Sequence, residues 1–430
     1  MATAEEIYQV FKQFPNISTD SRKIEKGCIF FALKGDNFNG NKYAEAALEK
    51  GAVCAIIDEP EFSVPAKTIL VENVLQELKD LANLHRKKLG IPILAITGTN
   101  GKTTTKELIS AILSQKFKVS FTEGNLNNHI GVPLTLLKMN TDTEIGVVEM
   151  GANHPGEIAE LCILAEPNYG IITNIGKAHL EGFGSFEGVI KTKSELYKYI
   201  KSKNGTIFYN HDNPVLAELA SEIENKISYG TVNANFTGEL LSSPPFVHLK
   251  ANFKKGVLYL NTNLTGDYNF ENVLAAACIG NYFEVDPIVI QLALKKYNPQ
   301  NNRSQLINKN GIKIIMDAYN ANPTSMQASI TSFMSIASSN KYLILGDMLE
   351  LGEYSKPEHK AILELLKNYP GTTIYVVGKN FNEIAGKYNC RPFLNVELLC
   401  TFLQQNPITT GDILIKGSRG IQLEKVLTCF

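Results

Sequence analysis

A glycine-rich segment followed by lysine and threonine marks a site for phosphate chemistry in this 430-residue sequence. The segment ITGTNGKTTTKE begins at Ile96, and its loop contains Gly98 and Gly101 before Lys102 and Thr103 open a predicted helix. Glycines let backbone N–H groups curl around phosphate oxygens, and a helix N-terminus adds about half a positive charge. Ile96 takes the place of the first glycine in the usual G-x-x-x-x-G-K-[ST] pattern. The strand-loop-helix context nevertheless favours a nucleotide site over an ordinary turn with a surface lysine.

Two further residues with useful chemistry follow predicted strands. Glu149 ends the apolar run GVVEM, and His179 follows the run YGIITNI. Ligands of parallel sheets gather at the carboxyl ends of the strands, where a carboxylate beside a phosphate loop suits Mg²⁺. A solvated glutamate and a structural histidine are the alternatives, and position alone does not separate them.

Lys193 lies in the predicted helical stretch EGVIKTKSELYKYI, two positions after Lys191. An unperturbed lysine has a pKa near 10.4, so only about one in a few thousand is uncharged at neutral pH. From its surroundings in the sequence, Lys193 is interpreted as a surface lysine that forms salt bridges.

Alternating strands and helices must position these residues. Residues 1–90 contain the short β-type runs CIFFALKG, AVCAIID and TILVE between helical stretches. The runs ILAIT, EIGVVEMG, YGIITNI and GTIFYN then alternate with helices, one of them from about Lys102 to Lys116, as in a parallel sheet covered on both faces. Residues 231–265 predict antiparallel hairpins, which two helices and the polar linker NPQNNRSQ follow. Four more strand-turn-helix units, beginning with KIIMDAYN, predict a second doubly wound sheet.

The predicted fold class is therefore α/β with three domains. We expect a small α/β N-terminal domain at 1–90, a central P-loop-type domain with a mostly parallel sheet at 91–300, and a C-terminal Rossmann-like domain at 301–430.

The composition is that of a soluble globular protein, with 44% hydrophobic residues, 20% charged residues and a net charge of −1. This balance gives no electrostatic footprint for nucleic acid or anionic lipid, so any phosphate must be bound locally. Seven scattered cysteines without a C-x-x-C pair argue against a disulfide framework and a zinc site. The N-terminus lacks the pattern of a signal peptide, and no apolar run approaches the ~20 residues of a membrane helix. These features predict a cytoplasmic protein without a nucleic-acid or membrane partner.

The loop GTNGKTT resembles that of the Mur ligases, with folylpolyglutamate synthetases as more distant relatives. Other family motifs follow in order along the whole chain: TDSRK at 19–23, GNLNNHIGVPLTLL at 124–137, EMGANHPGEI at 149–158, NIGKAHLEGFGS at 174–185, KTKSEL at 191–196, GDYNFENVLAA at 266–276, DAYNANPTSM at 317–326, GDMLELG at 346–352 and KGSRG at 416–420. Within the family, GANHPGEI, AHLEGFG and YNANPTSM most resemble the enzyme that adds D-alanyl-D-alanine to UDP-N-acetylmuramoyl-tripeptide.

The resemblance implies an ATP-dependent amide ligase of peptidoglycan precursor synthesis that acts as a monomer. The peptide carboxylate attacks the γ-phosphate of ATP, and the amine of the dipeptide then attacks the resulting acyl phosphate. Such chemistry needs positioning and charge neutralisation more than a protein nucleophile.

Site residues follow from the same resemblance. The implied catalytic residues are Lys102, Glu149, His179 and Lys193, and the ligands of two Mg²⁺ ions are Thr103, Glu149, His179 and Lys193, the last as a carbamate formed with CO₂. The implied ATP-binding residues are Gly98, Thr99, Asn100, Gly101, Lys102, Thr103, Thr104, Asn272, Arg303 and Asp317. Tyr268 stands where the Asn272 motif commonly has histidine, and the flanks of Arg303 depart from the usual Pro-Gly-Arg.

Both substrates also have implied contacts. The UDP end is expected at Thr19, Asp20, Ser21, Arg22, Asn125, Asn127 and Asn128, and the dipeptide near Asn320, Asn322 and Asp347. In isolation, TDSR could equally be a turn or a helix cap.

Alternatives remain at this point. The ligase that adds diaminopimelate or lysine typically carries Asp-Asn-Pro-Arg, whereas this chain has Lys379-Asn380-Phe381 after TIYVVG. Folylpolyglutamate synthetases usually continue the loop with Lys-Gly-Ser, unlike the Lys102-Thr103-Thr104 found here. Two hypotheses come from other functional classes: a nucleotide-binding regulator without ligase activity, and a P-loop kinase for a small substrate.

Overall fold

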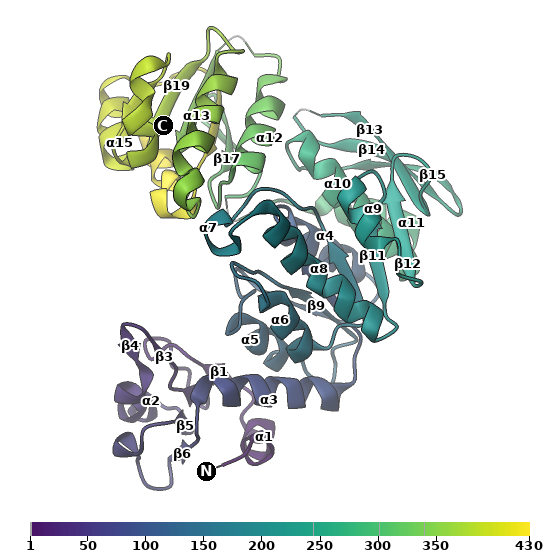
Figure 1. Ribbon diagram of the computed structural model, residues 1–430, viewed down its shortest axis with the longest axis vertical. Coiled ribbons are helices and arrows are strands. Elements are labelled where there is room, and N and C mark those ends of the chain that lie inside the picture. Colours follow the sequence, from purple (N-terminus) through teal and green to yellow (C-terminus); the bar gives the residue numbers. More distant parts are fainter. Residues whose placement is uncertain (1, 244, 301, 339) are drawn as a thin grey trace.

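The N-terminal part of the computed structural model is a small parallel sheet with helices packed on it (Figure 1). Residues 2–243, 245–300, 302–338 and 340–430 are described. The sheet order is β1 (Ile17–Ser18), β2 (Ile29–Phe31), β5 (Cys54–Ile57) and β6 (Thr68–Leu70), with a hairpin of β3 (Lys34–Gly35) and β4 (Phe38–Asn39) and helices α1 (Ala4–Gln13), α2 (Ala44–Glu49) and α3 (Val74–Leu89). The apolar face of α3 packs on α5 (Gly131–Leu137) and α6 (Glu157–Ala165), two helices of the central domain, so Leu78 and Leu81 share one core with Leu136 and Leu161.

The central sheet has nine strands in the order β15-β14-β13-β12-β11-β10-β7-β9-β8. Its strands are β7 (Ile93–Thr97), β8 (Val119–Phe121), β9 (Ile145–Glu149), β10 (Tyr169–Ile172), β11 (Thr206–Asn210), β12 (Lys226–Gly230), β13 (Phe236–Ser242), β14 (His248–Phe253) and β15 (Gly256–Asn261). Strands β7 to β13 pair in parallel, and β14 and β15 complete the sheet in antiparallel fashion. The antiparallel strands predicted within residues 231–265 are therefore confirmed, and they extend the parallel sheet.

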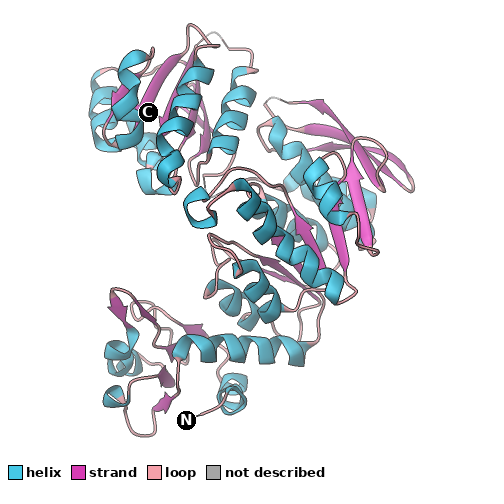
Figure 2. Ribbon diagram, in the orientation of Figure 1, coloured by secondary structure: helices cyan, strands magenta, loops and turns pink. Residues whose placement is uncertain are grey.

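Helices cover both faces of the central sheet (Figure 2). They are α4 (Lys102–Leu113), α5 (Gly131–Leu137), α6 (Glu157–Ala165), α7 (Leu180–Phe183), α8 (Phe186–Ser202), α9 (Pro214–Ala220), α10 (Phe270–Tyr282) and α11 (Pro287–Lys296). Helix α4 ends three residues before the predicted Lys116, because the chain tightens into a turn in which the Lys116 N–H donates to the Leu113 carbonyl at 3.0 Å.

The C-terminal sheet has the order β16-β17-β21-β18-β19-β20 and is parallel except for β16. Its strands are β16 (Gln305–Lys309), β17 (Ile312–Asp317), β18 (Lys341–Gly346), β19 (Thr373–Val377), β20 (Arg391–Phe393) and β21 (Gly411–Lys416), with helices α12 (Pro323–Met334), α13 (Ser355–Leu366), α14 (Lys379–Ile384) and α15 (Val396–Gln405). Separate apolar cores fill its two faces, which confirms the doubly wound prediction. Of the predicted linker NPQNNRSQ, Asn301 lies outside the described residues and Gln305 begins β16.

The topology explains why distant motifs meet. Strand β7 lies between β9 and β10, so the chain leaves β7 in one direction and later returns on its other side. Ligands of open α/β sheets bind at such a switch point, beyond the carboxyl ends of the strands. The glycine-rich segment follows β7, Glu149 is the last residue of β9, and His179 lies in the loop after β10. Within the described residues, no helix has the length and apolar character needed to cross a membrane.

Candidate active site

A cavity of about 1190 Å³ opens where the central and C-terminal sheets face each other. Fifteen of the predicted site residues line it: Thr99, Asn100, Gly101, Lys102, Thr103, Thr104, Asn125, Asn127, Asn128, Glu149, His179, Asn272, Arg303, Asp317 and Asn320. The fold thus brings most of the predicted residues into one place, although some of them lie more than 200 residues apart in the chain.

Two glycines give the nucleotide loop its shape. Gly98 has φ +144° and Gly101 has φ +77°, a backbone region that favours glycine. Any Cβ at Gly98 would collide with the Thr173 hydroxyl, and one at Gly101 would collide with the side-chain amide of Asn272. The loop is therefore packed tightly against β10 on one side and α10 on the other.

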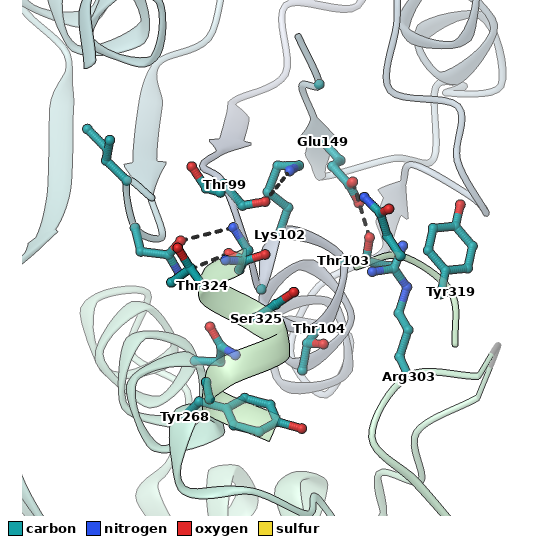
Figure 3. Close-up of a pocket in the computed structure, with 18 of the residues that line it drawn as sticks. Thr99, Lys102, Thr103, Thr104, Glu149, Tyr268, Arg303, Tyr319, Thr324 and Ser325 are labelled. Atoms are coloured by element: carbon teal, nitrogen blue, oxygen red, sulfur yellow. Dashed lines mark hydrogen bonds between the residues drawn. The ribbon is translucent and has the colours of Figure 1, made fainter. Parts of the chain in front are cut away.

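Lys102 begins α4 and folds back over its own loop (Figure 3). Its Nζ donates to the carbonyl oxygens of Gly98 at 2.7 Å and Thr99 at 3.0 Å. Burial lowers the pKa of this ammonium to about 8 despite the attraction of Glu149. Because phosphate oxygens would favour the charged form, nucleotide binding should raise that pKa again.

Glu149 lies at the end of β9, beside the start of α4. Its Oε1 accepts hydrogen bonds from the Thr103 hydroxyl at 3.1 Å and from the Asn127 amide at 2.8 Å. Its Oε2 is buried, accepts no hydrogen bond from the described residues and lies 3.8 Å from Lys106 Nζ. A buried carboxylate oxygen next to a hydroxyl and a phosphate loop fits Mg²⁺, which takes few protein ligands and fills its shell with phosphate and water.

His179 caps the short helix α7 with a left-handed backbone, φ +50°. Its Nδ1 pairs with the carboxylate of Glu350, a residue of the C-terminal domain. This contact lowers the pKa of Glu350. Among the described residues there is no preformed cluster of three or more His, Cys, Asp and Glu side chains for a metal.

Lys193 and Lys191 occupy different environments on α8. Lys191 is exposed, whereas Lys193 is only 2% exposed and its Nζ lies 5.5 Å from the centre of the Phe183 ring. Burial, helped by the nearby Lys102 charge, lowers the pKa of Lys193 to about 7. The interpretation of Lys193 as a surface salt-bridge lysine is thus wrong, because one helical face turns this residue inward.

Asp317 ends β17, and its carboxylate faces three partners. Oδ2 accepts from Lys416 Nζ at 2.6 Å and from the Ser329 hydroxyl at 3.0 Å, while Oδ1 lies 3.4 Å from the Ser304 N–H. Burial opposes ionisation, but the Lys416 ammonium outweighs it, so the pKa of Asp317 lies below its usual value.

The other nucleotide candidates come from both domains. Asn272 is held at both ends, since its Oδ1 accepts from the Thr105 hydroxyl at 3.1 Å and its Nδ2 donates to Asn269 at 2.9 Å. Arg303 lies beside Tyr319, with its guanidinium carbon 3.6 Å from the ring centre (Figure 3). Tyr268, at the position of the family histidine, also lines the cavity, and its hydroxyl is 3.0 Å from the Ser304 hydroxyl.

The three residues predicted to lie near the dipeptide, Asn320, Asn322 and Asp347, have different surroundings in the structure. Asn320 is exposed in the cavity. Asn322 caps α12 and donates from Nδ2 to Asn100 Oδ1 at 2.8 Å, which links the C-terminal domain to the nucleotide loop. Asp347 is buried outside the cavity lining, where its carboxylate accepts the N–H groups of Asn380 at 2.8 Å and Phe381 at 2.9 Å. Its role here is to cap α14.

The UDP candidates fall in two regions. Asn125, Asn127 and Asn128 line the cavity, whereas residues 19–22 form a turn after β1 in the N-terminal domain, away from the lining. In that turn Arg22 forks onto Asp20 with two 2.9 Å bonds, and these bonds lower the pKa of Asp20 to about 2.

Sequence reasoning missed several residues that shape the site. Thr173 and Asn174 follow β10 and bind the loop through Asn100, with the Thr173 hydroxyl donating to the Asn100 carbonyl at 2.6 Å. Lys106 faces Glu149 from within α4 and is 1% exposed. Tyr319 provides the surface under Arg303. Asn174 and Tyr319 belong to motifs that were recognised as units, but only contacts assign a function to each member.

Comparison with known proteins agrees with this geometry. Three family models match in order: "Mur ligase family, catalytic domain" over residues 13–94, "Mur ligase middle domain" over 96–280 and "Mur ligase, glutamate ligase domain" over 302–397. The UDP-N-acetylmuramoyl-tripeptide–D-alanyl-D-alanine ligase of Bacillus subtilis is 34% identical, over 96% of this chain and 92% of its own. The chain belongs to the Mur ligase family. The predicted three-domain α/β fold of a Mur ligase is thereby confirmed.

Solved Mur ligase structures superpose on nearly the whole chain. MurF from Acinetobacter baumannii matches with a TM-score of 0.87 and 28% identity, covering 99% of this chain and 98% of that one. The MurF ligase of Thermotoga maritima in complex with ADP matches with a TM-score of 0.83 and 28% identity, covering 96% of each chain. The relation therefore extends through all three domains.

Proposed function

We propose that this chain is an ATP-dependent, ADP-forming ligase that joins D-alanyl-D-alanine to the tripeptide carboxylate of UDP-N-acetylmuramoyl-tripeptide, a step in peptidoglycan precursor synthesis. Relatives of that name align over almost the full length. The observation that carries the proposal is a single cavity that joins the nucleotide loop, Glu149 and the polar residues of the C-terminal domain.

The reaction proceeds in two balanced steps. First, the tripeptide carboxylate attacks the γ-phosphorus of ATP, the bond from that phosphorus to the bridging oxygen breaks, and ADP leaves an acyl phosphate behind. The uncharged amine of the dipeptide then attacks the acyl carbon, and the bond from that carbon to the phosphate oxygen breaks. The nitrogen loses one proton, which the departing inorganic phosphate takes up as the amide forms. Lys102 and Arg303 neutralise charge on the phosphates, and Asn322 docks the C-terminal domain against the loop at Asn100.

Thr103 and Glu149 would hold one Mg²⁺, and His179 with Lys193 a second. Such ions neutralise phosphate charge in the transition state. The Oε2 atom of Glu149, which accepts no hydrogen bond from the described residues, supports the first position. Lys193 supports the second, because burial lowers the pKa of its amine to about 7, which makes the uncharged form that reacts with CO₂ accessible near neutral pH. Lys191 is too exposed for this role.

The two ends of the larger substrate would lie in different domains. Thr19, Asp20, Ser21 and Arg22 are proposed for the UDP end, and the cavity-lining Asn125, Asn127 and Asn128 for the segment that leads to the reacting carboxylate. Asn320 is the best placed of the three dipeptide candidates. The chain is proposed to act as a monomer, and the need for ATP and a UDP-linked substrate favours the cytoplasm.

A direct test is to incubate the protein with ATP, Mg²⁺, UDP-N-acetylmuramoyl-tripeptide and D-alanyl-D-alanine, and to follow the mass of the UDP-linked species together with phosphate release. An ATP-dependent gain of one dipeptide less water is expected. Reaction with diaminopimelate or lysine instead would assign another step of the family. A phosphorylated product without phosphate release would indicate a kinase, and no reaction with any donor would favour a regulator.

A further inference from the structure

Arginine is scarce in this chain, with five among 42 basic residues. Three of the five have partners outside the cavity. Arg22 binds Asp20, Arg86 donates to main-chain carbonyls including that of Ala165 at 2.7 Å, and Arg391 lies 3.8 Å over the Phe402 ring. The other two are Arg303 and Arg419, and both line the cavity. Arginine differs from lysine by its planar fork, which matches carboxylate and phosphate oxygens in pairs.

Both cavity arginines flank the same tyrosine. The guanidinium carbon of Arg303 is 3.6 Å from the centre of the Tyr319 ring, and that of Arg419 is 5.3 Å from it. Arg303 precedes β16, whereas Arg419 belongs to the KGSRG loop after β21. Contact with an aromatic face holds a guanidinium in place while its N–H groups stay free for a ligand.

The loop that carries Arg419 is firmly anchored. The Ser418 N–H donates to the Asp347 carbonyl at 3.1 Å, and the Ser418 hydroxyl accepts the Leu349 N–H at 3.0 Å. Arg419 itself is exposed, and its guanidinium forms no ion pair and no hydrogen bond with the described residues. A fixed backbone thus presents an unused fork to the cavity.

The charged residues that line the cavity indicate which kind of ligand the Arg419 guanidinium could bind. Lys416, the neighbouring cation, is 2% exposed and already bound to Asp317 at 2.6 Å. Several carboxylates line the same cavity, among them Glu149, Glu157 and Glu350. A second anion entering beyond the phosphates would meet these like charges, and the exposed guanidinium of Arg419 could offset them.

The proposed reaction brings such an anion. A dipeptide donor reacts through its amine, and its own carboxylate is carried through unchanged. An extended dipeptide spans about 7 Å, so this carboxylate must lie a short way from the acyl phosphate. Arg303 is the arginine already proposed for the phosphates. Burial lowers the pKa of Lys102 in the nucleotide loop, Glu149 opposes that shift and the charge of Arg303 adds to it, so Arg303 lies within electrostatic reach of the loop. Arg419 is then left for the distal end of the donor.

We propose that Arg419 binds the terminal carboxylate of the incoming dipeptide through a two-pronged contact and so selects donors that carry a free carboxylate at this length. The inference rests on the proposed function. It assigns the exposed arginine of the KGSRG loop to recognition of the donor.

The test compares R419Q, R419K and the control R391Q, using D-alanyl-D-alanine and its uncharged C-terminal amide as donors. Arg391 is a suitable control because it also lies over an aromatic ring in the C-terminal domain but is absent from the cavity lining. R419Q should raise the KM for D-alanyl-D-alanine by roughly 10- to 100-fold, with smaller changes in the KM values for ATP and the UDP-tripeptide. The KM of R419K for D-alanyl-D-alanine should lie between those of wild type and R419Q, since lysine keeps the positive charge but lacks the planar pair of N–H donors.

The amide supplies the decisive comparison. Wild type and R391Q should prefer the free acid over the amide by roughly 10-fold or more, and R419Q should lose that preference. Equal preference in wild type and R419Q, or a KM rise confined to the UDP-tripeptide or ATP, overturns the assignment while leaving the ligase intact. If the wild type transfers neither donor, the proposed function fails and the assignment fails with it. Thermal unfolding and ADP binding check that R419Q is folded.

Discussion

Replacing Gly101 by alanine tests whether packing against Asn272 shapes the nucleotide loop. Gly101 has φ +77° and ψ −4° at the N-terminus of α4. A Cβ there would overlap Asn272 Oδ1 and lie 3.0 Å from both Cγ and Nδ2, whereas ordinary contacts begin at 3.4 Å. The amide, or the loop, must therefore move by about 1 Å.

Two costs add in this variant. Left-handed backbone costs alanine about 1–2 kcal/mol relative to glycine. Displacing Asn272 also strains its bonds to Thr105 at 3.1 Å and to Asn269 at 2.9 Å, each worth about 1 kcal/mol net. Gly101→Ala should thus lower the free energy of unfolding by about 3–4 kcal/mol.

Gly90 provides a matched control, because it has nearly the same backbone, φ +65° and ψ 8°, with open space around the missing Cβ. Gly90→Ala should lower the free energy of unfolding by only the about 1–2 kcal/mol that a left-handed backbone costs alanine. Urea unfolding measures both variants. The KM for ATP should rise on the order of 100-fold in Gly101→Ala and stay unchanged in Gly90→Ala, since a 1 Å displacement of the loop misplaces the phosphates. Equal destabilisation of the two variants, with an unchanged KM for ATP, would refute the reasoning.

Three further outcomes are expected. Glu149→Gln should weaken Mg²⁺-dependent ADP binding by more than the roughly 10- to 100-fold typical of outer-shell changes, and calorimetry with and without Mg²⁺ would reveal an unchanged affinity if the metal position is wrong. Lys193→Gln should abolish turnover and the mass of one bound CO₂ in the intact protein, whereas Lys191→Gln should alter neither; equal effects of the two variants would contradict the burial argument. Lys416→Met should lower the free energy of unfolding by about 3–5 kcal/mol at neutral pH, because the largely buried carboxylate of Asp317 loses its ion-pair partner. Because the folded pKa of Asp317 is lowered, the pair stabilises the fold above its unfolded pKa of about 4 and ceases to do so as the pH falls through the folded pKa. The difference in the free energy of unfolding between wild type and variant, measured in urea, should therefore shrink as the pH is lowered through that range.

The nucleotide loop and the acid at the end of β9 could be predicted from the sequence because their chemistry is local. Glycines before Lys102 and Thr103 set the turn and the helix start, and an apolar run ending in Glu149 places a carboxylate at a sheet edge. Asp347 illustrates the opposite case. It also follows an apolar strand, yet its carboxylate turns to the N-terminus of α14 rather than to the cavity. A residue at the end of a strand can be predicted to lie at the edge of the sheet. Which groups its side chain contacts depends on how the following helices pack there, as the contacts of Asp347 with α14 show.

By itself, the sequence determined the three α/β units, the order of the family motifs and the residue types available for phosphate and metal chemistry, since periodicity and short motifs act within a few turns of chain. Only the tertiary structure decided which lysine of α8 is buried, that Asn322 reaches Asn100 across two domains, and that Arg303 and Arg419 meet on Tyr319. These facts depend on helix rotation and domain packing. They are set by contacts between residues far apart in the chain, and no local pattern encodes them.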